Sequence, residues 1–156
     1  MTVKWKALFV SLAVPLAVGG LSAFLTKDSM KEFSQLRQPP LTPPMWVFPV
    51  VWTVLFVMMG FASYLIYTSA AGTGEKRRAL TLYAVQLAVN FGWPILFFDL
   101  NWWMPAFFWL LLLWGLILWT MLWFGRFRRM AGLLLLPYLL WVSYAGYLNL
   151  GVALLN

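Results

Sequence analysis

Cysteine and histidine are both absent from the 156 residues, and acidic residues are scarce. Without cysteine there is no disulfide, thiolate nucleophile, cysteine zinc site or iron–sulfur cluster. Without histidine there is no Ser–His–Asp triad, HExxH zinc site or histidine-ligated haem. The four carboxylates, Asp28, Glu32, Glu75 and Asp99, all lie between apolar blocks, so a buried proton relay or catalytic carboxylate pair is excluded. We expect no metal site and no cofactor, and any chemistry must use aromatic side chains, a bound ligand or both.

Charged residues are also few, at 10% of the chain, whereas a soluble domain has about 25%. Apolar and aromatic residues make up 63%, with eleven Trp, thirteen Phe and six Tyr. A soluble domain of this size has too little interior to bury them. The net charge of +7 comes from short basic clusters between apolar blocks, which argues against a nucleic-acid partner. The composition therefore predicts a protein of the lipid bilayer.

Five uncharged stretches are long enough to cross a bilayer, which takes about 20 residues. They cover residues 7–25, 46–67, 79–98, 102–124 and 130–155, and the long first loop covers residues 26–45. The first stretch is longer than the apolar region of a signal peptide, so we expect it to be retained. We predict an all-α integral membrane protein in which residues 1–156 form one domain, a bundle of five transmembrane helices.

Basic residues predict the orientation of these spans. Eight of them belong to the amino terminus, the second loop and the fourth loop, and three belong to the opposite side. The eight are Lys4, Lys6, Lys76, Arg77, Arg78, Arg126, Arg128 and Arg129, and the three are Lys27, Lys31 and Arg37. The positive-inside rule then predicts a bacterial cell membrane protein with its amino terminus in the cytoplasm and its carboxyl terminus outside.

Prolines occur once in each predicted span and four times in the first loop. The span prolines are Pro15, Pro49, Pro94, Pro105 and Pro137. Each removes a backbone donor, and together they are typical either of ordinary membrane helices or of a bundle bent around a cavity. The loop prolines lie within residues 39–44 and form a stiff segment. This segment is equally consistent with a lid over the bundle and with a spacer.

One face of the third span carries polar residues. At 100° per residue, Gln86, Asn90 and Trp93 fall within about 60° of one another. The two amides need partners in hydrocarbon. Interhelical hydrogen bonding and a polar anchor in an apolar ligand pocket account for them equally well.

The opposite face of the third span carries small residues. Ala84, Ala88 and Gly92 are spaced four residues apart. Small residues at this spacing let two membrane helices approach closely. We expect this face to pack against another helix, within the monomer or across a dimer.

Aromatic stripes occur in two further spans. They comprise Trp52, Phe56 and Met59 in the second span, and Tyr138, Trp141, Ala145 and Leu148 in the last. Such stripes are most often bundle core. Each of three spans nevertheless carries a Trp well inside its ends, which favours a cavity walled by flat rings that suits a planar, apolar ligand.

Three segments resemble signatures of the TspO/MBR family, the translocator or peripheral-type benzodiazepine receptor proteins. They are PPMWVFP at residues 43–49 followed by VWT at 51–53, QLAVNFGWP at 86–94 with FF at 97–98, and LPYLLW at 136–141 continuing through residue 149. Their order and spacing match those of the family along nearly the whole chain. The sequence therefore resembles a bacterial member of this family.

The resemblance implies a homodimeric five-helix bundle that binds porphyrins such as protoporphyrin IX, synthetic isoquinoline-type ligands and sterols. Matched by position, the family's pocket residues fall on Trp52, Phe56, Asn90, Trp93, Trp141 and Ala145. Phe33 of the first loop, together with Gln86 and Tyr138, completes our candidate ligand-binding set. The resemblance also implies that Ala84, Ala88 and Gly92 form the dimer contact.

The resemblance leaves three functions open. The first is a membrane receptor or sensor for porphyrins, with Lys31 or Arg37 meeting the propionates. The second is light-dependent porphyrin degradation, in which Trp52 and Trp141 are the catalytic residues. The third is transport of tetrapyrroles or sterols, against which the spans offer no ionisable coupling residue. No Lys or Arg follows Arg129, so the cholesterol motif of animal members is incomplete here.

Overall fold

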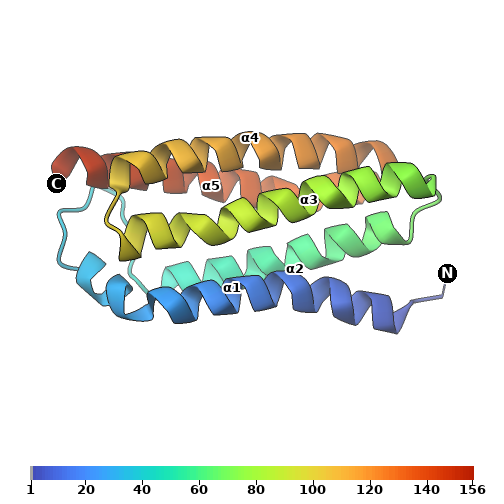
Figure 1. Ribbon diagram of the computed structural model, residues 1–156, viewed down its shortest axis with the longest axis horizontal. Coiled ribbons are helices and arrows are strands. Elements are labelled where there is room, and N and C mark those ends of the chain that lie inside the picture. The colour runs from blue at the N-terminus through green and yellow to red at the C-terminus, as the bar shows by residue number, and fades with distance from the viewer. Residues whose placement is uncertain (1) are drawn as a thin grey trace.

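The structure, a computed structural model, describes residues 2–156, which form five long α-helices in a single bundle. The helices are α1 (Trp5–Phe33), α2 (Val47–Tyr67), α3 (Thr73–Pro94), α4 (Trp103–Phe127) and α5 (Arg129–Leu155), and a π-helical turn, η1 (Ile95–Asp99), continues α3. All five run along the same long axis (Figure 1). Each is long and apolar enough to span a membrane. The predicted all-α, five-helix membrane bundle is thus confirmed.

The first helix is longer than its uncharged stretch. Residues 26–33, which we expected in the first loop, form the last two turns of α1, so the loop covers residues 34–46. A helix of 29 residues is about 44 Å long, whereas the hydrocarbon core is about 30 Å thick. The charged turns that contain Lys27 and Lys31 are therefore the part of α1 that extends beyond the hydrocarbon. The first turn of α3, which begins at Thr73 rather than residue 79, extends for the same reason.

The span prolines differ in their effects. Pro49 and Pro105 are each the third residue of a helix, where the missing N–H would have no intrahelical acceptor. Pro94 ends α3, and the chain then continues as the π-helical turn, in which the Leu100 N–H donates to the Ile95 carbonyl at 3.0 Å. This change of winding re-aims the side chains that follow Pro94, including Phe98.

The helices pack in a definite order around the core. α5 packs against α4 and α2, α3 packs against α4, and α1 lies at the edge of the bundle against α2. Large apolar side chains of α1, such as Trp5, Phe9 and Phe24, are exposed. In a bilayer these side chains face lipid.

The first loop is attached to α5. The Tyr147 hydroxyl donates to the Pro40 carbonyl at 2.7 Å, and the Tyr144 hydroxyl donates to the Leu41 carbonyl. The carbonyl of Leu41 is presented by a left-handed backbone with φ of 71°, which is unusual for Leu. At the far end of α5, the Asn156 side chain exchanges two hydrogen bonds with the backbone of Arg37. The loop therefore lies along the carboxyl-terminal half of α5.

The ends of the helices separate the basic residues as predicted. The amino terminus, the α2–α3 loop and the α4–α5 junction lie at one end of the bundle, and the first loop and the carboxyl terminus lie at the other (Figure 1). We call the former the basic end, because it holds the eight basic residues of the larger group.

Candidate functional site

A cavity of about 330 Å³ lies between α1, α2 and α3, in the half of the bundle away from the basic end. The lining residues come from one face of each helix and from η1. They are Gly19, Ser22, Ala23, Thr26, Lys27, Met30, Phe48, Pro49, Trp52, Phe56, Asn90, Trp93, Pro94 and Phe98. Its volume is at the lower end of the range for small-molecule sites.

Aromatic rings form two walls of this cavity. On α2, Trp52 stacks on Phe56 with ring centroids 5.6 Å apart and planes inclined by 28°. On α3 and η1, Trp93 stacks on Phe97 at 5.1 Å and meets Phe98 edge-on at 5.9 Å. Flat apolar walls of this kind match a planar ligand better than a branched or compact one.

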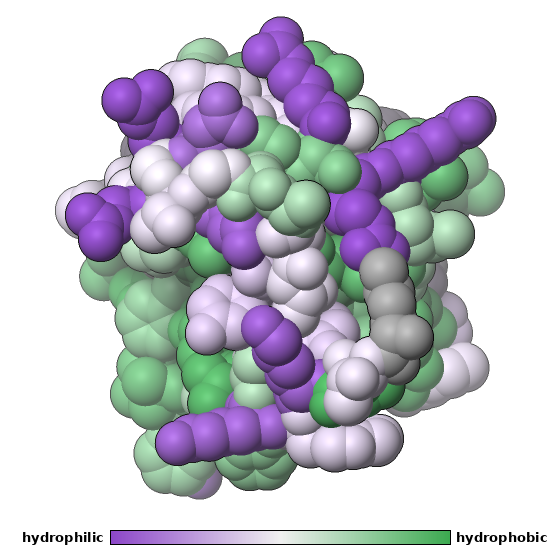
Figure 2. All heavy atoms as spheres, turned by 90° about the vertical axis from the view of Figure 1, so that its right-hand side faces the viewer, coloured by the Kyte–Doolittle hydropathy of each residue, from purple (hydrophilic) through white to green (hydrophobic). Residues whose placement is uncertain are grey.

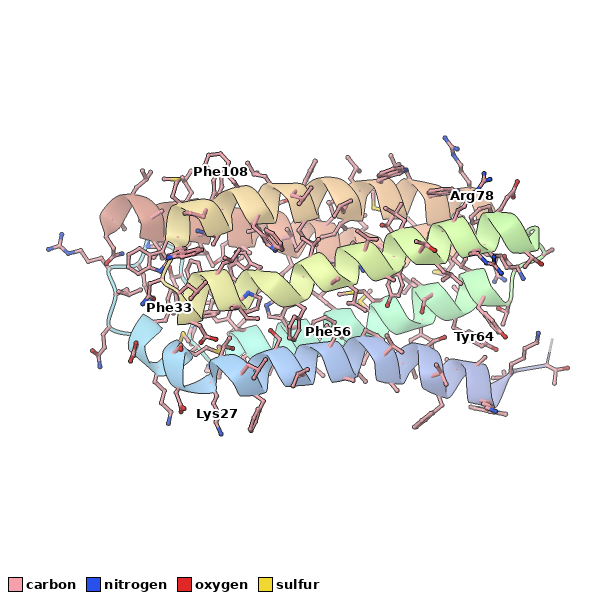
Figure 3. All side chains as sticks on the ribbon, in the orientation of Figure 1. Lys27, Phe33, Phe56, Tyr64, Arg78 and Phe108 are labelled. Carbon is pink, nitrogen blue, oxygen red and sulfur yellow. The ribbon has the colours of Figure 1, made fainter. Side chains whose placement is uncertain are left out.

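The third wall is α1, and its shape depends on a glycine. A Cβ atom at Gly19 would lie only 2.2 Å from the Phe56 ring. Glycine therefore lets the Phe56 ring rest directly on the backbone of α1, between α1 and α3 in Figure 3. The same wall contributes a polar atom, because the buried Ser22 hydroxyl has no hydrogen-bond partner among residues 2–156.

Asn90 is a polar group of the cavity that is tied to the core behind it. Its Nδ2 donates to the Tyr138 hydroxyl at 2.6 Å, and that hydroxyl donates to Gln86 Oε1 at 2.8 Å. All three side chains are buried. The Gln86 amide nitrogen has no partner within the described part of the chain. The polar face of α3 therefore serves both as an interhelical hydrogen-bond network and as a wall of the cavity.

A second hydrogen-bonded chain orients Trp93. Its Nε1 donates to Asn149 Oδ1 at 3.0 Å, and Asn149 Nδ2 donates to the Trp103 carbonyl at 2.7 Å. This chain joins α3, α5 and the start of α4. It satisfies the indole N–H of Trp93 in the core and leaves the ring as a cavity wall.

The charged residue that lines the cavity is Lys27, on the last turns of α1. Its ammonium lies 4.5 Å from the Phe24 ring centroid and is directed away from the bundle (Figure 3). Lys31 and Arg37, which the sequence suggested as partners for propionates, do not belong to the lining. A positive charge therefore stands beside the cavity, but it comes from a different residue.

The structure brings together some of the predicted ligand residues and separates others. Trp52, Phe56, Asn90 and Trp93 line the cavity, and Gln86 and Tyr138 lie directly behind Asn90. Phe33 does not line it but packs on Phe98, which does, with ring centroids 5.4 Å apart.

Trp141 and Ala145 do not line this cavity. Ala145 is buried in the bundle core, and Trp141 lines a separate groove between α2 and α5. The Trp141 ring meets Phe48, a cavity residue, with centroids 5.9 Å apart. Trp52 of α2 thus lines the cavity, whereas Trp141 of α5 lies at a separate groove between α5 and α2.

The small-residue face of α3 is also divided. Gly92 packs against Trp109 of α4, since a Cβ there would lie 2.9 Å from the Trp109 ring. Ala84 and Ala88 are exposed. Packing within the monomer therefore uses Gly92 alone of the three and leaves the two alanines on the surface.

Besides Phe48, Pro49, Pro94 and Phe98, the lining residues that the candidate ligand-binding set missed are those of α1. Gly19, Ser22 and Thr26 form a stripe of small residues on one face of α1. That spacing was a usable signal, but Gly19 and Ser22 were placed in the first predicted span, residues 7–25, whereas Thr26 was placed in the first loop, residues 26–45.

Comparison with known proteins finds similarity along nearly the whole chain. The chain matches the model of the TspO/MBR family over residues 11–155. It is 40% identical over 154 residues to the tryptophan-rich protein TspO of Chlorobaculum tepidum, covering 96% of this chain and 94% of that protein. It is 34% identical over 151 residues to the translocator protein of Bos taurus, with 96% and 89% covered. It is 33% identical over 156 residues to the tryptophan-rich sensory protein of Cereibacter sphaeroides, with 100% and 95% covered.

Proposed function

The chain belongs to the TspO/MBR family, and we propose that it is a membrane receptor or sensor that binds protoporphyrin IX or a related flat tetrapyrrole in the α1–α2–α3 cavity. The observation that carries this proposal is the pair of aromatic walls, Trp52 with Phe56 and Trp93 with Phe98, around a single amide, Asn90. Stacking on such walls recognises a planar ring, and the amide fixes its orientation.

The cavity volume indicates how the macrocycle is held. A space of about 330 Å³ takes one edge of the ring system. The opposite edge, which carries the propionates, then stays outside the cavity, where Lys27 supplies a positive charge. With neither His nor Cys in the chain, a metal-free porphyrin suits this site better than haem.

The first test is titration of the purified protein with protoporphyrin IX in the dark, followed by the quenching of Trp fluorescence. We expect saturable quenching, and a threefold to tenfold weaker affinity in Trp52→Leu, about the effect of losing one stacked ring. Trp141→Leu is the matched control, because Trp141 lies outside the cavity. Equal affinities in the wild type and Trp52→Leu would contradict the proposed site.

Illumination of the same samples tests a second function, light-dependent porphyrin degradation. The observation that favours it is that Trp52, an oxidisable ring, stands in the cavity wall. We expect loss of porphyrin absorbance to slow more in Trp52→Phe than in Trp141→Phe. Trp141 is separated from the cavity by the ring of Phe48, whereas Trp52 lines it. If porphyrin absorbance is not lost in the light, the receptor function is the only one of the two that remains.

Homodimerisation is part of the same proposal. Ala84 and Ala88 are exposed on α3 and allow a second helix to approach closely. We propose that two copies meet along this face in a bacterial cell membrane, with the basic end in the cytoplasm.

A further inference from the structure

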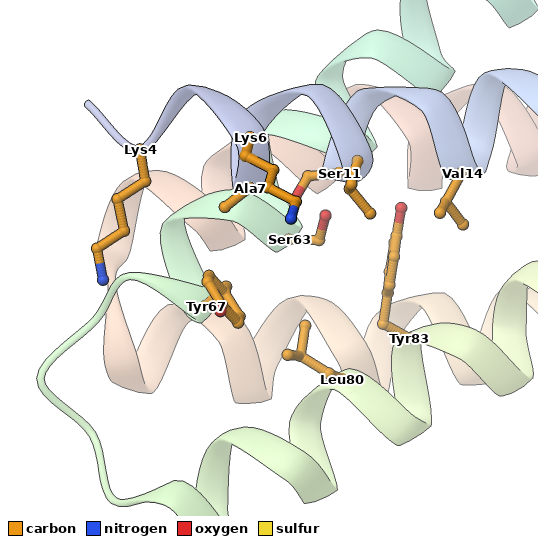
Figure 4. A pocket seen from close by; sticks show the side chains of 10 residues that line it. Lys4, Lys6, Ala7, Ser11, Val14, Ser63, Tyr67, Leu80 and Tyr83 are labelled. Carbon is orange, nitrogen blue, oxygen red and sulfur yellow. The ribbon is translucent and has the colours of Figure 1, made fainter.

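A second cavity lies between α1, α2 and α3, at the basic end. It has a volume of about 590 Å³ and is lined on α1 by residues within 4–14, whereas the ligand cavity uses residues 19–30 of that helix. Figure 4 shows it between the first turns of α1 and the facing turns of α3. The two cavities therefore share helices but no lining residue.

The walls of this second cavity combine aliphatic side chains with two tyrosine rings, Tyr67 and Tyr83. Val10, Val14 and Leu80 line it, and none of its lining residues is a Trp or Phe. Val10 and Val14 are also about half exposed, at 51% and 47%. The cavity is therefore continuous with the surrounding bilayer, and a flexible chain fits its walls better than a flat ring.

A buried hydroxyl without a partner points into the cavity. Tyr83 is only 6% exposed, and its hydroxyl has the Ser63 side chain beside it but makes no hydrogen bond of normal geometry with residues 2–156. In Figure 4 this hydroxyl is directed at α1 between Ser11 and Val14. The Ser63 hydroxyl, also in the lining, instead donates to the Gly60 carbonyl at 2.9 Å. Because Ser63 is a poorly aligned neighbour, an acceptor on the occupant would satisfy the Tyr83 hydroxyl better than the protein alone does.

Two cations stand at the mouth of the cavity. Lys4, the residue before α1, and Lys6, on its first turn, are exposed lining residues, and the Lys4 ammonium lies 6.0 Å from the Tyr67 ring centroid. Figure 2 views this end of the molecule and shows hydrophilic side chains distributed over it. The occupant therefore carries an anionic group at the membrane surface and an apolar part that lies deeper.

We propose that this cavity binds an anionic phospholipid of the leaflet at the basic end. Lys4 and Lys6 pair with the phosphate, the Tyr83 hydroxyl donates to an ester carbonyl oxygen, and an acyl chain runs along Val10 and Val14. The lipid thus supplies what each part of the cavity lacks. Its phosphate provides a negative charge, its ester carbonyl a hydrogen-bond acceptor, and its acyl chain a flexible apolar segment.

The test is native mass spectrometry of the full chain in detergent, titrated with dioleoylphosphatidylglycerol or dioleoylphosphatidylcholine. We expect one phosphatidylglycerol to bind more tightly than phosphatidylcholine. The variant Lys4→Gln/Lys6→Gln should weaken phosphatidylglycerol binding about tenfold or more, because two charge-assisted contacts with the phosphate are lost. The control Arg77→Gln/Arg78→Gln removes the same charge from the same end without touching the cavity, and should change affinity less than twofold. Equal losses in both pairs would overturn the proposal in favour of general surface attraction.

Tyr83→Phe provides a second test that does not alter charge. It should weaken both lipids about threefold to tenfold, since a hydrogen bond to a buried group is lost. It should change thermal stability little in lipid-free detergent, because the contact of the hydroxyl with Ser63 is not a hydrogen bond of normal geometry. Unchanged lipid affinity would contradict the assigned role of this hydroxyl. Displacement of phosphatidylglycerol by protoporphyrin IX, reduced by Lys4→Gln/Lys6→Gln, would identify the site as one for tetrapyrrole carboxylates and overturn the lipid assignment.

Discussion

The side-chain amide of Asn90 donates a 2.6 Å hydrogen bond to the hydroxyl of Tyr138, and this bond joins the wall of the ligand cavity to the core of α5. Tyr138 passes the connection on to Gln86 through a second bond of 2.8 Å. Three polar side chains are thereby paired inside an otherwise apolar bundle. The network fixes the rotamer of Asn90 before any ligand arrives, which lowers the entropic cost of binding.

Tyr138→Phe removes the centre of this network. Both Asn90 and Gln86 then lose a partner while remaining buried, so we expect the free energy of unfolding to fall by about 1–3 kcal/mol. Thermal unfolding in detergent, followed by circular dichroism, measures the effect. Tyr67→Phe, at an exposed position of α2, should be near neutral. Equal stabilities of Tyr138→Phe and the wild type would show that the two bonds contribute nothing net.

The polar face of α3 could be predicted from the sequence because it depends only on local geometry. A helix turns 100° per residue wherever it forms, so Gln86, Asn90 and Trp93 must share a face. The structure places all three on one buried side of α3. Apolar length likewise predicted the five helices, because each span must satisfy its own backbone in hydrocarbon.

The contributions of α1 and α5 could not be predicted, because they depend on how whole helices rotate against one another. Trp141 has the same mid-span position as Trp52, yet the rotation of α5 turns it into a groove outside the cavity. Conversely, Gly19 has no side chain that could identify it as a site residue in the sequence. Its role follows only from the ring of Phe56 that rests against it.

Gly19→Ala tests that contact. The added Cβ would lie 2.2 Å from the Phe56 ring, so the ring must move and the cavity changes shape. We expect protoporphyrin IX affinity to fall about tenfold, together with a loss of about 1–3 kcal/mol in stability from overpacking. Gly20→Ala is a close control, since a Cβ there meets nothing within 4 Å. Titration and thermal unfolding should show lower affinity and lower stability in Gly19→Ala than in Gly20→Ala. Identical values for the two variants would contradict the packing of α1 on Phe56.

Ala84→Leu/Ala88→Leu tests the proposed dimer face. Both positions are exposed in the single chain, so the larger side chains should leave the monomer folded but keep a second helix at a distance. We expect the dimer dissociation constant to rise about tenfold or more, measured by light scattering in detergent across a dilution series. Gly115→Leu, on α4 in open space, should leave the dimer intact. An unchanged dimer in the α3 variant would assign the interface to another helix.

Gly151→Ala tests the attachment of the first loop to α5. A Cβ at Gly151 would lie 2.5 Å from Pro39, so the loop must lift away from the helix at this point. The backbone of Arg37, two residues earlier, is held by Asn156, and its peptide bond is a trypsin site that this contact protects. We expect cleavage after Arg37 to become several-fold faster in the variant, scored by mass spectrometry of the two fragments.

The control for loop release is Gly146→Ala, whose Cβ would make only an ordinary contact, 3.9 Å from Leu110. Cleavage after Lys31, within α1, serves as an internal reference because α1 does not depend on Gly151. If cleavage becomes faster after Arg37 but not after Lys31, the loop detaches from α5 as a unit. Because the loop leads directly into Phe48 and Pro49 of the ligand cavity, its release should also weaken porphyrin binding. Equal cleavage rates in Gly151→Ala and the wild type would instead show that the hydrogen bonds of Tyr144, Tyr147 and Asn156 hold the loop without close packing at Gly151.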